Sequence, residues 1–100
     1  MGIGTLTGLS NLIGEVVSVV TVSGEYVGVF EGEGKDGEIV VKNPRMLIAT
    51  EEGVGFARGL CMTGMADAKM VRFKDYVFLT ATNDDFANSY REATSLIQRV

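Results

Sequence analysis

The sequence predicts a mainly β fold, with five short strands in one domain of 100 residues, a short helix before them and a longer helix after them. Three observations predict this class. β-Branched and aromatic residues occur in short runs, and tight-turn signals such as Ser23-Gly24 separate these runs. The clearest helical repeat is confined to residues 82–100.

The expected strands follow one another along the chain. We place them at residues 15–22, 25–31, 38–43, 69–73 and 76–81, with 44–50 continuing extended and one more strand allowed within 56–62. The first strand is apolar on both faces, so a closed barrel or a subunit contact should cover both of its sides. Pro44 lacks an amide donor and therefore belongs at an edge, a bend or a strand end.

The helices are predicted from the spacing of apolar residues. A short N-terminal helix would present Ile3, Leu6, Leu9, Leu12 and Ile13 on one face. The C-terminal helix, over residues 83–99, carries the stripe Phe86, Tyr90, Ala93, Ile97 and Val100. Thr82 or Asn83 would cap its start, and Phe86, Tyr90 and Ile97 are expected to dock on the barrel or on a neighbouring subunit.

The composition excludes several classes of function. No histidine is present, so the usual general base near neutral pH and the commonest metal ligand are missing. No catalytic motif is complete, so we expect neither an enzyme nor a cofactor. The net charge of −4 argues against non-specific binding of nucleic acid, DNA included, and no apolar run is long enough to cross a membrane. The single cysteine, Cys61, is expected to be buried in a cytoplasmic protein.

Residues 32–37 match the pattern G-x-G-x-x-G, but a strand follows them where a dinucleotide site requires a helix. A flexible hairpin loop is therefore the better interpretation. Four carboxylates crowd the same loop, Glu31, Glu33, Asp36 and Glu38. They lack the spacing of a calcium loop, so a solvated charged hairpin is favoured over a divalent-cation site, and no metal is expected.

Three methionines, Met62, Met65 and Met70, recur near the end of the glycine-rich segment 51–68. They are interpreted as core filler in preference to an adaptable contact surface for a partner.

The order of these elements resembles the Sm/Lsm family of ring-forming RNA-binding proteins. "VVSVVTVSGEYVGVFEG…EIVV" is similar to the first Sm motif, with Gly28 at the glycine of the bent second strand. "MVRFKDYVFL" is similar to the second motif, where Val71-Arg72 stand for Ile-Arg. The resemblance covers about residues 5–81 and implies a single Sm-like domain, a strongly bent five-stranded antiparallel (SH3-like) barrel to which the helix 83–99 is added. Full closure of such a barrel would remove the sheet edges.

The chain departs from the Sm pattern where RNA binding is concerned. Phe73 replaces the glycine of the second motif, and "GEGKDGE" replaces the loop that carries the family's Asp and Asn. The resemblance implies a cyclic homo-oligomer whose pore-side residues for single-stranded RNA are Arg72, Phe73, Lys74 and Lys35. Two hypotheses stay open: an RNA-binding ring active in RNA metabolism, and a structural or protein-interaction ring, as in a small phage-type or accessory protein, in which Arg72 and Lys74 are turn charges paired with Asp75 or a neighbour's carboxylate.

Overall fold

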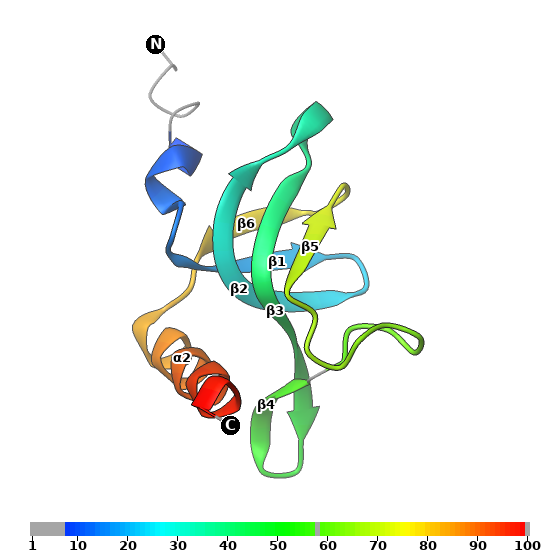
Figure 1. The fold of residues 1–100 in the computed structure, drawn as a ribbon, viewed down its shortest axis with the longest axis vertical. Helices are drawn as coiled ribbons and strands as arrows, with labels where there is room; N and C mark the ends of the chain where they lie inside the picture. Colours follow the sequence, from blue (N-terminus) through cyan, green and yellow to red (C-terminus); the bar gives the residue numbers. More distant parts are fainter. Residues whose placement is uncertain (1–7, 58, 100) are drawn as a thin grey trace.

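The computed structural model describes residues 8–57 and 59–99, and for residues 96–99 the backbone alone. The predictions for Ile3, Leu6, Val100 and the Ile97 side chain lie outside this range. The chain forms a curled sheet with a helix at each end (Figure 1). In order, the elements are η1 (Gly8–Leu12), β1 (Val16–Thr21), β2 (Gly24–Glu33), η2 (Lys35–Gly37), β3 (Ile39–Thr50), β4 (Gly53–Ala57), β5 (Met70–Phe73), β6 (Phe78–Ala81) and α2 (Asp84–Arg99).

All the strands pair antiparallel in one sheet of order β4-β3-β2-β1-β6, and β5 pairs with β3 beside the path. The sheet has six strands where five were predicted. The extra strand is β4, which covers residues 53–57 and not 56–62, because it pairs with the C-terminal half of β3 from Thr50↔Gly53 to Met46↔Ala57. The mainly β, strongly bent antiparallel fold is confirmed.

The prediction that the barrel closes fully is wrong, because the ladders that the described residues form leave the barrel open. β5 pairs with β3 and β6 pairs with β1, and no ladder joins β5 to β6. Residues 74–77 connect these two strands through a series of bends that leads β6 away from β5, and not through a hairpin turn. The curled sheet is therefore open between β5 and β6.

The bend in β3 lets this one strand pair with two different strands along the same edge, β5 and β4. Residues 39–42 pair with β5, and residues 46–50 pair with β4, while β2 pairs with residues 39–42 and 45–46. Between the halves, Asn43 has a φ of 50° and Pro44 is buried. Pro44 thus lies at a bend, one of the positions predicted for it. The Asn43 amide donates to the carbonyl of Lys69 at 2.8 Å, which holds the start of β5 at the bend.

Gly28 is the residue of β2 that faces this bend. A Cβ built at Gly28 would contact the Val41 side chain, the Lys42 carbonyl oxygen at 2.9 Å and the Pro44 Cα at 3.2 Å. Two of these three contacts are with backbone, which cannot move aside as a side chain can. The close approach of β2 to β3 therefore requires glycine at this position.

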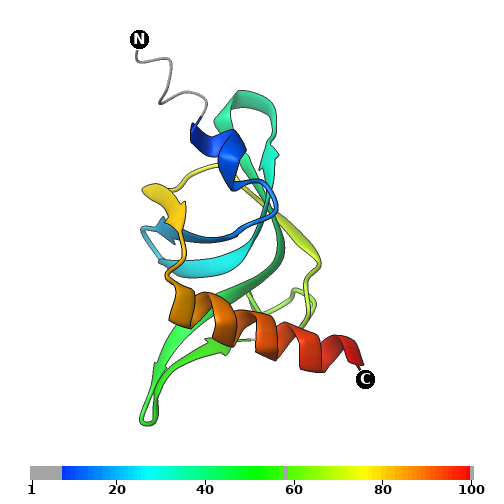
Figure 2. The same ribbon diagram turned by 90° about the vertical axis from the view of Figure 1, so that its left-hand side faces the viewer.

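Strand β1 is buried on both faces, as its apolar pattern predicts. Val17 and Val19 point into the barrel interior, where they pack with Phe30, Ile39 and Val41. Val16 points the other way, into a second cluster with Val27, Ala87 and Tyr90. Helix α2 covers this outer face, so the two-sided burial of β1 needs no subunit contact. The two helices lie at opposite ends of the barrel, with α2 laid across the sheet (Figure 2).

Helix α2 is anchored by Tyr90. Its ring is 2% exposed, and its hydroxyl donates to the carbonyl of Asn43 at 2.7 Å and to that of Lys42 at 3.4 Å, so the helix holds the bend of β3. Asn83 caps the helix, because its Oδ1 accepts from the Phe86 amide at 2.9 Å. Docking is confirmed for Tyr90, whereas Phe86 is only half-buried. At the other end, η1 is a short 3-10 helix whose Leu9 and Leu12 pack on the core.

Replacing Gly28 by alanine is expected to destabilise the protein by about 2–3 kcal/mol, because the new methyl group overpacks the β2–β3 contact. Gly55→Ala is the matched control, since its nearest neighbour is Thr50 Cγ2 at 3.9 Å and its φ is not positive. We expect that change to leave stability unchanged or to raise it by about 0.4–1 kcal/mol. Urea denaturation midpoints check both, and equal midpoints for the two variants would contradict the close-approach argument.

Tyr90→Phe is expected to cost about 1 kcal/mol at neutral pH, because the Asn43 and Lys42 carbonyls lose their donor. Burial raises the pKa of Tyr90 to about 12, although the nearby Arg45 charge acts in the opposite direction. The stability that this hydroxyl contributes is therefore complete below its unfolded pKa of about 10 and is lost as the pH rises towards 12. Denaturation of both proteins at about pH 8 and about pH 11 should show the difference shrinking; a difference that grows with pH would contradict this.

Candidate functional site

The structure brings the two loops that carry the predicted site residues together. Arg72, on β5, lies opposite Val40 of β3, and its Nη1 donates to Glu38 Oε1 at 3.1 Å. In the turn that follows β5, the Tyr76 hydroxyl donates to the carbonyl of Gly37 at 3.5 Å. The hairpin at 31–38 and the segment at 72–77 therefore form one surface, which we call the loop surface.

Arg72 is an ion-paired residue on this surface. Its side chain is 62% exposed and that of Glu38 is 14% exposed, so the pair sits at the edge of the protein with the carboxylate inside. The predicted partner was Asp75 or a carboxylate from another subunit, whereas the partner found is Glu38, 34 residues away. The pairing of β3 with β5, which no local sequence signal predicts, sets Arg72 opposite Val40, and Glu38 lies two residues before Val40 within reach of the guanidinium group.

Phe73 packs against the barrel. Its ring is half-buried beside the interior cluster, and its centroid lies 5.1 Å from that of Tyr26 with the rings tilted by 55°. This side chain covers the core. Lys35 and Lys74 are both exposed. Of the four predicted RNA-binding residues, Arg72 is paired with a carboxylate and Phe73 packs on the core. Lys35 and Lys74 are exposed and could contact a ligand.

The loop surface carries more acid than base. Residues 31–38 and 72–75 contain five carboxylates, Glu31, Glu33, Asp36, Glu38 and Asp75, and three basic residues, Lys35, Arg72 and Lys74. All of these except Glu38 are exposed. Phosphate groups are bound through an excess of basic charge. The surface that holds the predicted RNA-binding residues is therefore net acidic once the two loops are placed together.

The glycine pattern at 32–37 is a hairpin loop, as predicted. Gly32, Asp36 and Gly37 all have positive φ, at 133°, 57° and 80°, and β3 follows the loop with no helix at which a pyrophosphate could bind. Among the residues that the structure describes, no three or more His, Cys, Asp or Glu side chains are arranged to hold a metal ion.

Two predictions about the segment before β5 are wrong. Cys61 is exposed and not buried, and Met62, Met65 and Met70 are 102%, 74% and 53% exposed and are not core filler. The glycines of this segment keep it irregular, so it runs over the surface without a partner sheet. Beneath it lies an apolar cavity of about 310 Å³, whose lining includes Tyr26, Leu60, Cys61, Met65, Val71 and Phe73.

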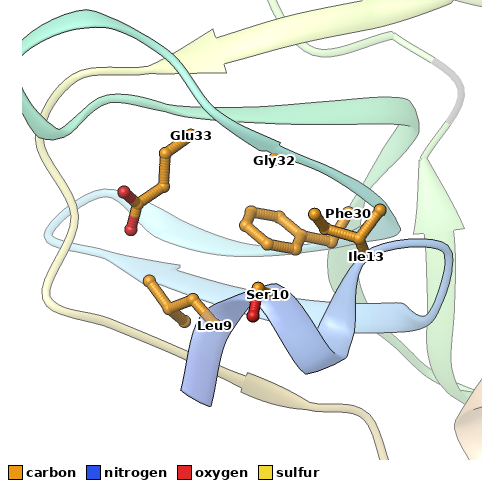
Figure 3. A pocket seen from close by; sticks show the side chains of 6 residues that line it. All are labelled: Leu9, Ser10, Ile13, Phe30, Gly32 and Glu33. Atoms are coloured by element: carbon orange, nitrogen blue, oxygen red, sulfur yellow. The ribbon is translucent and has the colours of Figure 1, made fainter. Parts of the chain in front are cut away.

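A smaller cavity of about 170 Å³ lies between η1 and β2 (Figure 3). Leu9 and Ile13 from the helix face Phe30 and Gly32 of the strand across it, with Glu33 at one end. Ser10 is the other polar side chain of the lining, and the lining holds no second ionisable group, histidine or lysine to form an acid–base pair or to activate the hydroxyl. This cavity has no catalytic arrangement.

Sequence reasoning missed the buried Arg45. Its side chain is 5% exposed, and it lies 3.6 Å from Asp67 and donates to the Pro44 carbonyl at 2.9 Å. The pair fastens the irregular segment 59–69 to the bend of β3. A charged residue within an extended apolar stretch indicates a buried ion pair. The sequence does not identify the partner, because Asp67 lies 22 positions away.

The open side of the barrel exposes two strand edges with apolar side chains. In the described part of the chain, β5 pairs only with β3 and β6 only with β1, so one edge of each strand has no backbone partner. Met70, at the start of β5, and Val77 and Phe78, at the start of β6, are 53%, 61% and 49% exposed. Unpaired edges with large apolar side chains are typical of surfaces that receive another chain.

Comparisons with known proteins identify the fold. No protein-family model and no curated protein match this sequence. Among solved structures, the chain is similar to a heptameric archaeal Sm protein, with a TM-score of 0.53 and 11% identity over 77% of this chain and 98% of that one. At this identity the likeness concerns the fold alone. The strongly bent antiparallel sheet is Sm-like, and α2 follows it at the C-terminus. No described helix is long and apolar enough to span a bilayer.

Proposed function

We propose that this protein assembles into a ring of identical subunits, in which the free edge of β5 pairs with the free edge of β6 in the next subunit. The two edges belong to different strands, so the contact is heterologous, and a heterologous contact closes into a ring when its rotation divides a full turn evenly. The solved structure with a similar fold is described as a heptamer. The exposed Met70, Val77 and Phe78 lie where the two edges would meet and would lose water in the contact.

A third free edge, that of β4, is a weaker candidate for this contact. It contains Gly53 and Gly55, and two carboxylates, Glu51 and Glu52, stand in the turn at its start. Charge and glycine at an edge discourage strand addition. The β5 and β6 edges therefore carry the assembly.

We infer that the ring acts as a structural or protein-interaction assembly and not as an RNA-binding one. The observation that carries this choice is the Arg72–Glu38 ion pair at 3.1 Å within a net acidic loop surface. In this pair, Glu38 binds Arg72, the basic residue that the Sm resemblance assigns to RNA. Phe73 is packed against Tyr26 and cannot stack on a base without leaving the core.

RNA binding is the second candidate, because Lys35 and Lys74 are exposed on loops that the Tyr76–Gly37 hydrogen bond joins. In a ring these lysines would repeat around the axis. Such a site would hold short, U-rich single strands weakly, since stacking worth about 1–3 kcal/mol per base is missing.

Phe78→Asp is expected to dissociate the ring, because a carboxylate at the paired edge would be buried without a partner. The matched control is Val54→Asp on β4, since Val54 is 54% exposed against 49% for Phe78 and lies outside both edges. Sedimentation velocity at one protein concentration gives the masses. A wild-type protein that sediments as a monomer, or a Phe78→Asp variant as large as the control, contradicts the assembly.

Fluorescence anisotropy with a labelled U-rich oligonucleotide at low salt separates the two functions. We expect no saturable binding by the wild type up to about 100 μM, the weak end of non-specific affinity. Glu38→Gln should bring weak binding into range, because it releases Arg72 and removes one negative charge per subunit. Saturable wild-type binding whose salt slope falls by about one for each of Arg72→Ala and Lys74→Ala would establish the RNA function instead.

A further inference from the structure

The β3–β4 hairpin has an apolar face that continues beyond the helix packed on it. Leu47 pairs with Phe56 and Ala49 pairs with Val54, so these four side chains share one face. Phe56 lies 6.2 Å from the Tyr90 ring, centroid to centroid, which identifies this as the face that α2 covers. Leu47 and Phe56 pack on the cluster beneath the helix, whereas Ala49 is exposed and Val54 is 54% exposed.

A groove of about 210 Å³ lies where this uncovered face meets the start of α2. Val27, Leu47 and Val54 line it from the sheet, and Phe86 lines it from the helix. The polar groups Ser18 and Thr82 also line it and bond to each other at 2.8 Å, so they do not need a ligand to be satisfied. The volume is below the 300–1,000 Å³ or so of small-molecule sites and suits one apolar side chain of a larger partner.

Carboxylates lie in the lining of the groove and within three residues of it along the chain. Glu25 lines it, Glu51 and Glu52 stand at the turn of the hairpin, and Asp84 and Asp85 begin α2. All five are exposed. The helix dipole offsets part of the charge of the two aspartates, and no described Lys or Arg forms an ion pair with the three glutamates. No described Lys or Arg lines the groove, and the nearby Arg45 is buried against Asp67.

We propose that this groove is a docking site for a protein partner that presents an apolar side chain, such as Leu, within a short run of lysines or arginines. The apolar walls would bury the leucine, and the rim carboxylates would attract and orient the flanking cations. The charges disfavour RNA or an anionic membrane surface. They also disfavour a second copy of this chain, which carries a net charge of −4. The groove uses no residue of β5 or β6, so the inference does not depend on the ring.

The test is the binding of a fluorescein-labelled hexapeptide, KKLLKK, to the full-length protein, followed by anisotropy, with EELLEE as the charge-reversed probe. The blocking variant is Val54→Arg, which places a cation in the groove. Its control is Val22→Arg, because Val22 is a 97% exposed valine in the turn between β1 and β2. A double variant, Glu51→Gln with Glu52→Gln, removes rim charge without filling the groove. Circular dichroism and light scattering establish that each variant is folded and assembled like the wild type.

We expect saturable binding of KKLLKK, weakened about tenfold or more by Val54→Arg, unchanged by Val22→Arg, and made less salt-dependent by the double glutamine variant. Three outcomes overturn the proposal: EELLEE binding as tightly as KKLLKK, an affinity that Val54→Arg leaves unchanged, or no saturation up to about 1 mM peptide. A change in assembled mass caused by Val54→Arg would assign the groove to contacts between copies of this chain and also overturns it.

Discussion

The bend of β3 at Asn43-Pro44 is the constraint on which the rest of this structure depends. It turns one strand of 12 residues through the fold, so that its first part pairs with β5 and its last part with β4. Gly28 allows β2 to follow the bend closely, and Tyr90 and Arg45 fasten α2 and the segment 59–69 to the same few residues. A side chain at position 28 would therefore disturb the sheet, the helix and the loop surface together.

The open side of the barrel follows from this geometry and bears on function. β5 pairs with the first half of β3 and β6 pairs with β1, and no ladder joins the two, so in the described structure each strand has a free edge. The same placement sets Arg72 opposite Val40, where Glu38 can reach it. One arrangement thus leaves two strand edges unpaired and pairs the basic residue that the Sm resemblance assigns to RNA, and both features support the proposed ring that binds proteins and not RNA.

Much of the fold could be predicted because its signals are local. Runs of β-branched residues predicted β1 and β2, and the stripe through Tyr90 predicted α2. The Sm resemblance placed Gly28 in the bent second strand, where the structure has it. What failed depends on distant partners. Strand β4 is rich in glycine and exists through its pairing with β3, and Arg72 meets Glu38 only across the β3–β5 ladder. Met62 and Cys61 are apolar residues in an irregular surface segment, where hydrophobicity alone does not predict burial.

Hydrogen exchange at the outward-facing amides of β5 and β6 tests the central claim most directly, namely that these two edges pair between subunits. In the isolated chain these amides point to solvent, whereas those of β1 are held between β2 and β6. If the edges join neighbouring subunits, the outward-facing amides within residues 70–73 and 78–81 should exchange in the assembled protein nearly as slowly as the amides of β1. Exchange at the rate of the exposed β3–β4 turn, in a protein shown to be assembled, would contradict the pairing and place the subunit contact elsewhere.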